Sequence, residues 1–124
     1  MDTKQQTGIR NLKLRLAVSI RDAVLMAVVS PNDLATLTGI PRQELGTIAD
    51  LRDDQRVALA GLMARVVDDG IHKFLYGLDN QPDGLEVRYQ GQLLNDETCC
   101  LPDDNVPIWQ FSQFGRDGLP KQKT

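Results

Sequence analysis

The chain has 124 residues, of which 41% are hydrophobic and 25% charged, and its formal net charge is −3. These proportions are typical of one globular domain and exclude a collagen-like, low-complexity or wholly disordered chain. The longest apolar run, residues 23–29, is far shorter than the ~20 residues that cross a bilayer. We therefore expect a cytoplasmic protein without a membrane segment, with one domain over residues 9–119 between disordered tails, residues 1–8 and 120–124.

Residues 9–29 are predicted to form the first helix, because apolar side chains recur there at three- and four-residue spacing. The turn that follows carries a helix start signal, in which Ser30 is a capping residue and Pro31 suits the first helical turn. A short helix up to Gly39 is expected, and then a second one from Pro41 to about Ala49.

Residues 34–48 match the spacing of a helix-turn-helix, with Gly39 at the turn and apolar residues on both sides. In a DNA-binding protein the second helix would present Arg42, Gln43 and Thr47 to the bases. A plain helical hairpin has the same spacing, and the acidic residues nearby would repel phosphate. DNA binding is therefore the less favoured alternative.

The clearest element is a long amphipathic helix over residues 53–78, which is predicted to be mostly buried and to form the centre of the core. Its apolar positions are Leu59, Leu62, Met63, Val66, Val67, Ile71, Phe74, Leu75 and Leu78. On this pattern an aspartate at Val66 or at Leu75 is expected to unfold the protein.

The single histidine, His72, lies four residues from both Asp68 and Tyr76 on this helix, an arrangement from which a general base can be built. The neighbouring Arg65, Asp69 and Lys73 indicate instead a charge-paired surface, and no nucleophile is placed to work with His72. We expect no enzymatic activity and no catalytic residue.

After a run of turn-forming residues, the apolar period changes from helical to two. Leu85, Val87 and Tyr89 alternate with polar residues, and Gln90-Gly91 predicts a tight turn into a second strand. Residues 95–107 are expected to form an acidic loop, and residues 108–114 a last strand. The predicted fold class is α+β, with helices first and a small antiparallel sheet after them.

Cysteine usage gives no indication of a disulfide framework or of a metal site. Cys99 and Cys100 are adjacent, so they are expected to be reduced thiols, and neither a Cys-x-x-Cys pair nor a second histidine is present. The sequence contains no cofactor motif, and we predict neither a cofactor nor a metal.

Residues 51–121 resemble a family of small bacterial proteins of unknown function. The resemblance rests on Leu51, Gln55 and Arg56, on the Asp69-Gly70-Ile71-His72 segment, and on Leu75, Trp109 and the Gly118-Leu119-Pro120 ending. It departs at Leu119, where the family would have tryptophan, and in the loop with both cysteines. It implies a long helix, a hairpin and a terminal aromatic strand, and it assigns no catalytic residue.

Charge along the chain indicates the kind of partner. Residues 50–104 hold twelve acidic and five basic side chains, a net charge of −7. Such a surface is complementary to a basic protein, so we expect a protein-binding module, most concretely an immunity-type inhibitor that covers a basic toxin domain. The predicted binding residues are an acidic rim around an aromatic anchor: Asp96, Glu97, Asp103, Asp104 and Trp109.

Overall fold

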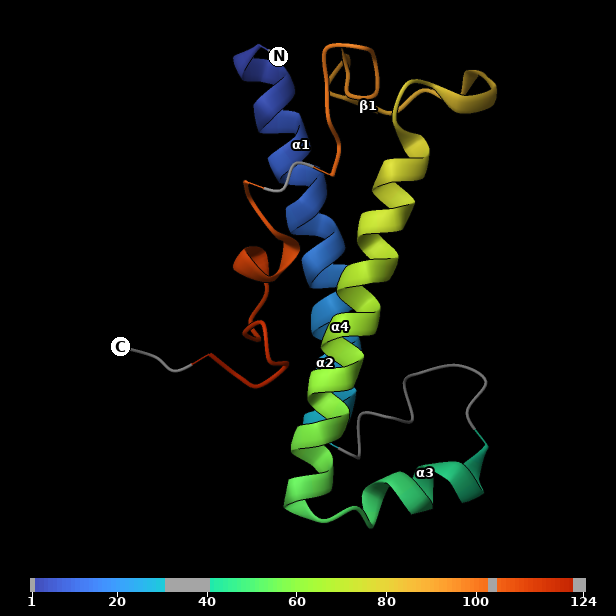
Figure 1. The fold of residues 1–124 in the computed structure, drawn as a ribbon, viewed down its shortest axis with the longest axis vertical. Coiled ribbons are helices and arrows are strands. Elements are labelled where there is room, and N and C mark those ends of the chain that lie inside the picture. The colour runs from blue at the N-terminus through green and yellow to red at the C-terminus, as the bar shows by residue number, and fades with distance from the viewer. Residues whose placement is uncertain (1, 31–40, 103–104, 122–124) are drawn as a thin grey trace.

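A computed structural model describes residues 2–30, 41–102 and 105–121 (Figure 1). The first helical segment runs without a break through α1 (Thr3–Leu16), a π-helical segment (Ala17–Asp22) and α2 (Ala23–Val29). The predicted helix over residues 9–29 is confirmed, and it begins six residues earlier than expected. None of the helices in the described parts of the chain is long and apolar enough to cross a membrane.

The prediction of a disordered tail is wrong for residues 3–8. The Asp2 carboxylate accepts a hydrogen bond from the Gln5 backbone, and the Gln5 side chain accepts one from the Asp2 backbone, at 2.7 and 3.0 Å. This capping box starts α1. Gln5 and Gly8 are then buried, and the Gln5 amide donates to the Leu93 carbonyl at 3.3 Å.

Helix α4 (Asp53–Leu78) has the predicted bounds and lies antiparallel to the first helical segment (Figure 1). The prediction that it is mostly buried is wrong. Its buried residues are the small and apolar ones that face the first segment: Ala60, Ala64, Ile71 and Leu75. Leu62, Val66 and Phe74 lie on another face and are 58%, 57% and 55% exposed.

Helix α3 (Arg42–Ala49) follows Pro41 and confirms the predicted helix there. The guanidinium of Arg56 connects three elements, because it donates to the carbonyls of Val28, Ile48 and Ala49 at 3.0, 3.1 and 2.7 Å. The short helix predicted before Gly39 lies outside the described residues.

The predicted hairpin is confirmed as two short antiparallel strands, β1 (Arg88–Tyr89) and β2 (Gln92–Leu93). Gln90 and Gly91 have φ angles of 48° and 81°, as a tight hairpin turn requires. Buried Asn95 connects the hairpin to α4, since its amide donates to the carbonyls of Leu78 and Leu85 at 2.7 Å each. Mainly helices with a two-stranded antiparallel sheet give the predicted α+β class.

The predicted strand over residues 108–114 is wrong. Residues Ile108–Phe111 form a 3-10 turn, and Phe114 makes one isolated bridge to Pro120. The segment packs beside the helices, away from the hairpin, so no strand among the described residues lies next to it (Figure 1). The tail predicted from residue 120 is wrong for residues 120–121, because Lys121 donates its backbone N–H to Gln113; residues 122–124 lie outside the described part.

Buried apolar residues form two clusters. The larger cluster joins the first helical segment and the C-terminal half of α4 to the loop after the hairpin. Its buried members are Ile9, Ala17, Ile71, Leu75, Leu94, Cys99, Leu101 and Ile108. The smaller contains Leu25, Ala64 and Phe114. Residues of the predicted acidic loop thus contribute to the core, because Cys99 and Leu101 turn inward.

Candidate binding groove

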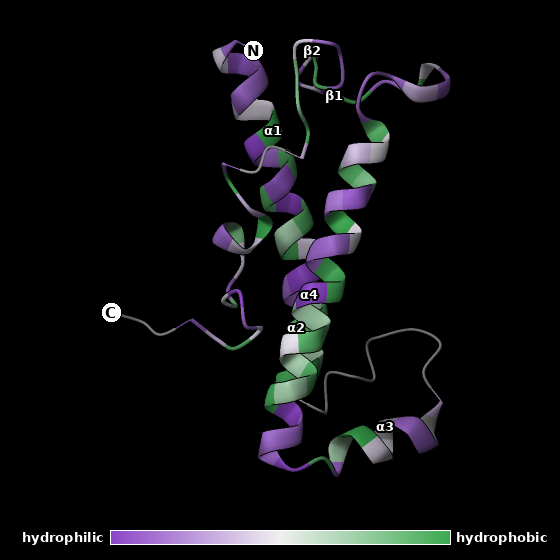
Figure 2. Ribbon diagram, viewed as in Figure 1, coloured by the Kyte–Doolittle hydropathy of each residue, from purple (hydrophilic) through white to green (hydrophobic). Residues whose placement is uncertain are grey.

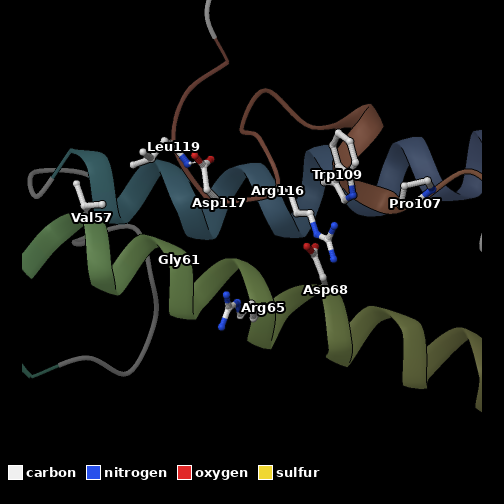
Figure 3. A pocket seen from close by; sticks show the side chains of 9 residues that line it. All are labelled: Val57, Gly61, Arg65, Asp68, Pro107, Trp109, Arg116, Asp117 and Leu119. Carbon is white, nitrogen blue, oxygen red and sulfur yellow. Dashed lines mark hydrogen bonds between the residues drawn. The ribbon is translucent and has the colours of Figure 1, made fainter.

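A groove of about 990 Å³ runs between α4 and the C-terminal segment, residues 107–119 (Figure 3). We call it the α4 groove. Residues from both walls line it: Val57, Gly61, Arg65, Asp68, Pro107, Trp109, Arg116, Asp117 and Leu119. The lower wall is one face of α4, and the opposite wall is the segment that the sequence predicted to be a strand.

The guanidinium of Arg21 holds the two walls of the groove together. Arg21 is fully buried in the π-helical segment, and its two bonds to the Asp68 carboxylate measure 2.7 and 3.2 Å. On the other side it donates to the Ser112 hydroxyl at 2.9 Å and to the carbonyls of Phe114 and Gly115 at 2.8 Å each. All five N–H groups that a guanidinium offers are therefore used inside the protein.

Asp22, the next residue, completes this buried network. One of its carboxylate oxygens accepts from the Ser112 hydroxyl and from the Gln113 backbone N–H, while the other has no hydrogen-bond partner among the described residues. Ser112 thus donates to a carboxylate and accepts from Arg21, and it is 5% exposed. In this position the hydroxyl connects the C-terminal segment to the first helical segment.

The C-terminal wall approaches α4 very closely at Gly118. This residue has a φ of 81°, and a Cβ atom added to it would collide with the carbonyl of Ala60. Only glycine meets both conditions at this point. Gly61, the neighbour of Ala60, lies on the groove floor, so small residues of α4 allow the wall to seat there.

Charges in the groove are of two kinds. The acids are engaged, because Asp68 is paired with Arg21 and Asp117 accepts the backbone N–H of Leu119 at 3.0 Å. By contrast, Arg65 on α4 and Arg116 on the opposite wall take part in no hydrogen bond or ion pair with the described residues. Figure 3 shows the Arg116 guanidinium facing Asp68 across the groove. The groove is therefore a place where cationic donors are open to a ligand.

Both ends of the groove are apolar. Pro107 and Trp109 form one end, and Val57 and Leu119 form the other (Figure 3). The lysine Nζ of Lys121 lies 5.9 Å from the centre of the Trp109 ring. Along α4 the lining residues span twelve positions, from 57 to 68. These positions cover roughly 16 Å of helix axis, which is about the length of five residues of extended chain.

A smaller pocket of about 180 Å³ adjoins the groove and shares Asp68, Pro107 and Trp109 with it. His72 and buried Lys13 line this pocket, and Lys13 donates to the Val106 carbonyl at 3.0 Å. The Asp68 carboxylate predicted to accompany His72 is directed to Arg21 instead. On the other side, Lys73 pairs with Asp69 at 3.0 Å, as the charge-paired surface predicts.

Of the predicted acidic rim, the structure describes Asp96 and Glu97, which lie apart from the predicted aromatic anchor Trp109. Asp96 lies beside the hairpin, where its carboxylate accepts a hydrogen bond from the Gln5 amide at the start of α1. Trp109 lines the same pocket as Lys13, which is eight residues, or about 12 Å, further along α1 than Gln5. Glu97 is exposed next to Asp96, and Asp103 and Asp104 lie outside the described residues. The role of these residues in binding stays a prediction.

Hydrogen bonds from Thr98 set the ionisation of Asp96. The Thr98 hydroxyl and backbone N–H both donate to the carboxylate, at 2.6 and 2.9 Å, and they lower the pKa of Asp96. Burial raises the pKa of the neighbouring Cys99 thiol, and the Asp96 carboxylate acts in the same direction. Cys99 is buried and Cys100 exposed, and neither forms a disulfide bond within the described residues.

The residues of the DNA-binding alternative lie on α3. Gln43 and Thr47 are exposed, and the Thr47 hydroxyl donates to the Gln43 carbonyl at 3.1 Å; for Arg42 the structure describes the backbone only. The first helix of the predicted motif lies outside the described residues. In the described ranges, 2–30, 41–102 and 105–121, no three histidine, cysteine or acidic side chains gather into a possible metal site.

Sequence patterns did not point to Arg21, Ser112 or Arg116. One signal was present: Arg21 and Asp22 interrupt an apolar stretch, and charged residues inside such a stretch are buried only when they are paired. Comparison of the chain with models of protein families, with curated proteins and with solved structures found no match. The resemblance over residues 51–121 therefore stays a prediction.

Proposed function

We propose that this chain is a non-enzymatic protein-binding module that holds an extended segment of a partner protein in the α4 groove. The observation that carries the proposal is the pair of unengaged arginines, Arg65 and Arg116, on opposite walls between two apolar ends. A segment with an acidic residue in the middle and apolar residues on either side complements this pattern. Carboxylates form strong charge-assisted hydrogen bonds with guanidinium groups, and apolar side chains bury area at the ends.

The groove favours a peptide over a small metabolite because of its shape and length. It is open along α4 and has room for about five extended residues. The Arg21 donors behind its walls are all used within the protein, and the one buried oxygen of that network without a partner among the described residues belongs to Asp22, which does not line the groove. Its recognition would therefore rest on two cations and on apolar contacts.

A peptide titration tests the groove. The single tryptophan of the chain, Trp109, lines it and reports binding by its fluorescence. A capped pentapeptide, leucine-serine-glutamate-serine-leucine, should bind at least tenfold more tightly than the same peptide with glutamine, because a hydrogen bond to a charged group contributes about 1.5–3 kcal/mol.

Variants locate the site. Arg65→Gln and Arg116→Gln should each weaken binding of the glutamate peptide, while Arg52→Gln is the control, because Arg52 is an exposed arginine outside the groove. Equal affinity for both peptides, or an Arg65→Gln/Arg116→Gln double variant that binds as the wild type does, would exclude this site.

A second candidate is the immunity-type inhibitor, acting in the cytoplasm against a basic toxin. The observation that favours it is an acidic end of the molecule, where the end of α4 meets the hairpin. The acidic residues there are Asp79, Asp83, Glu86, Asp96 and Glu97, and Arg88 is the single basic residue in the range 79–99. Charge of this kind steers a basic partner and gives association a strong salt dependence.

Co-expression with the product of the neighbouring gene tests this second candidate. Neutralisation of a toxic product, with slower association in an Asp83→Lys/Glu97→Lys variant, would support it. A salt titration with random duplex DNA provides the contrast, because steeply salt-dependent binding to DNA would favour the helix-turn-helix alternative instead.

A further inference from the structure

The ammonium group of Lys121 contacts both the backbone and the ring of Trp109. Its Nζ donates hydrogen bonds to the carbonyls of Trp109 and Gln110 at 2.9 and 3.3 Å. The same nitrogen lies 5.9 Å from the centre of the Trp109 ring, just within the distance of a cation–π contact. One side chain therefore holds a residue that forms an apolar end of the α4 groove.

A tight reversal of the chain brings Lys121 back to this place. The Gly115 N–H donates to the Leu119 carbonyl at 2.8 Å, and the Lys121 N–H donates to the Gln113 carbonyl at 3.1 Å. The ammonium group thus reaches the C-terminal end of the 3-10 turn Ile108–Phe111. The last carbonyls of a helical turn favour a lysine there, because it donates to them and complements their partial negative charge.

The indole of Trp109 has no other polar anchor among the described residues. Ile108 beside it is buried in the larger cluster, whereas Trp109 is partly exposed and its indole N–H makes no hydrogen bond with the described residues. Figure 2 shows hydrophobic and hydrophilic residues side by side in this short turn. The Arg21 network holds the segment only from Ser112 onward. The orientation of the ring therefore depends on packing and on Lys121.

We infer that Lys121 is a positioning residue for ligand binding in the α4 groove, because it holds Trp109 in the orientation in which the ring lines the groove. The inference rests on the proposed function and adds a residue that does not itself line the groove. Lys121 is exposed, so each of its contacts is made in water and is modest in free energy. Their loss should release the Trp109 end, while the Arg21 network keeps the rest of the wall in place.

Acrylamide quenching of the protein without peptide tests the placement of the ring. Trp109 is the single tryptophan, so its fluorescence reports this end of the groove alone. Lys121→Met removes the charge and the donors, and it should raise the quenching rate constant about twofold because one face of the ring loses its cover. Lys121→Arg keeps a cation with N–H donors and should retain the wild-type rate constant.

Lys73→Met is the matched control for this measurement. Lys73 is an exposed lysine paired with Asp69, and it lines neither the groove nor the pocket beside it. Its replacement should leave the quenching of Trp109 unchanged. An unaltered helical circular dichroism spectrum identifies each variant as folded. The same quenching rate constant in Lys121→Met and in the wild type would overturn the inference.

Peptide affinity tests the consequence for binding. Lys121→Met should bind the glutamate peptide roughly fivefold more weakly than the wild type does, whereas Lys121→Arg should bind it nearly as well. A double-mutant cycle measured by calorimetry separates positioning from attraction between charges. In a Trp109→Ala background, Lys121→Met should have little further effect, because the residue that it positions is absent. A fivefold loss that persists in this background would show that Lys121 acts by its charge and not through the indole.

The inference and the proposed function fail in different ways. A wild type that does not bind the glutamate peptide contradicts the proposed function, and with it any role of Lys121 in binding. A wild type that binds the peptide, together with equal affinity in Lys121→Met, contradicts the role of Lys121 alone.

Discussion

Each N–H group of the Arg21 side chain has its acceptor on a segment distant in the sequence. Asp68 is 47 residues away, and Ser112, Phe114 and Gly115 are 91–94 residues away. Burying a guanidinium costs free energy that only complete pairing offsets. The network therefore contributes more to fixing the position of the C-terminal segment than to the net stability of the fold.

Replacement of Arg21 by methionine is expected to lower the free energy of unfolding by about 3–5 kcal/mol, because the Asp68 carboxylate and two carbonyls lose their donor in a buried place. Urea unfolding followed by circular dichroism measures the change. Arg52→Met is the control, since the ion pair of Arg52 with Asp54 is exposed and should contribute about 0–1 kcal/mol. Equal stability of both variants would contradict the structural role of Arg21.

The pKa of Asp96 provides a second test at the level of a single residue. Hydrogen bonds from Thr98 favour its charged form and lower its pKa in the folded state. The stabilisation from this carboxylate is therefore present at neutral pH and is lost as the pH falls through the lowered pKa.

An NMR titration of the Asp96 carboxyl should have its midpoint below the ordinary aspartate value of about 3.9. Thr98→Val should move the midpoint upward, and Thr98→Ser, which keeps the hydroxyl, should leave it nearly in place. A Thr98→Val midpoint equal to that of the wild type would show that the hydroxyl does not set this pKa.

At the scale of elements, α4 illustrates what periodicity determines. The apolar spacing predicted its bounds correctly, from Asp53 to Leu78. It did not predict which apolar face is covered, because Val66 and Leu75 follow the same spacing and only Leu75 meets the first helical segment. Helical spacing identifies apolar faces, whereas the packing of neighbouring elements decides which of them is buried.

Aspartate substitutions separate these two faces of α4. Leu75→Asp should unfold the protein, since it places an unpaired charge in a site that is 1% exposed. Val66→Asp should keep the helical circular dichroism spectrum of the wild type, because the new carboxylate is in contact with water. Loss of that spectrum in Val66→Asp would mean that the face is covered within a single chain.

The C-terminal segment was the element least accessible from the sequence. Trp109 and Phe111 alternate as in a strand, yet the backbone there turns into a 3-10 helix beside α1. Tertiary contacts position this segment: the hydrogen bonds from Arg21 and the close approach of Gly118 to Ala60. Interactions over such separations leave no local pattern, and for this reason the walls of the α4 groove were not predicted.

Gly118→Ala tests this docking. The left-handed backbone alone should cost about 1–2 kcal/mol with alanine, and the collision with α4 should add roughly 1–3 kcal/mol. Gly84→Ala is the matched control, because Gly84 has a similar φ of 79° and open space around its Cβ position. Urea unfolding of the two variants isolates the contact, and identical stabilities would show that the wall does not depend on it.

For the whole molecule, the two apolar clusters are joined through the Arg21 network and should unfold together. Cys99 belongs to the larger cluster, and the adjacent Cys100 is exposed, so the pair is an internal probe of opening. Burial also raises the pKa of the Cys99 thiol, which lowers its reactivity further.

A thiol-reactive disulfide reagent should modify one cysteine quickly and the second slowly in the native protein. The slow rate should rise with urea in proportion to the unfolded fraction, because Cys99 becomes accessible only when the cluster opens. Mass spectrometry assigns the fast site. Fast modification of both thiols without urea would indicate that the loop after the hairpin opens independently of the core.

The long sequence separations around Arg21 also bear on how the chain is made. Asp68 lies 47 residues after Arg21, and Gly115 lies 94 residues after it. The acceptors in the C-terminal segment are therefore synthesised well after the Asp68 carboxylate. At about 5–20 residues per second, the ribosome needs roughly 2–10 s to pass from one to the other. During that interval the nascent helical pair contains a guanidinium whose remaining acceptors do not yet exist. Residues 112–115, which are translated after both long helices, therefore complete the buried network around Arg21.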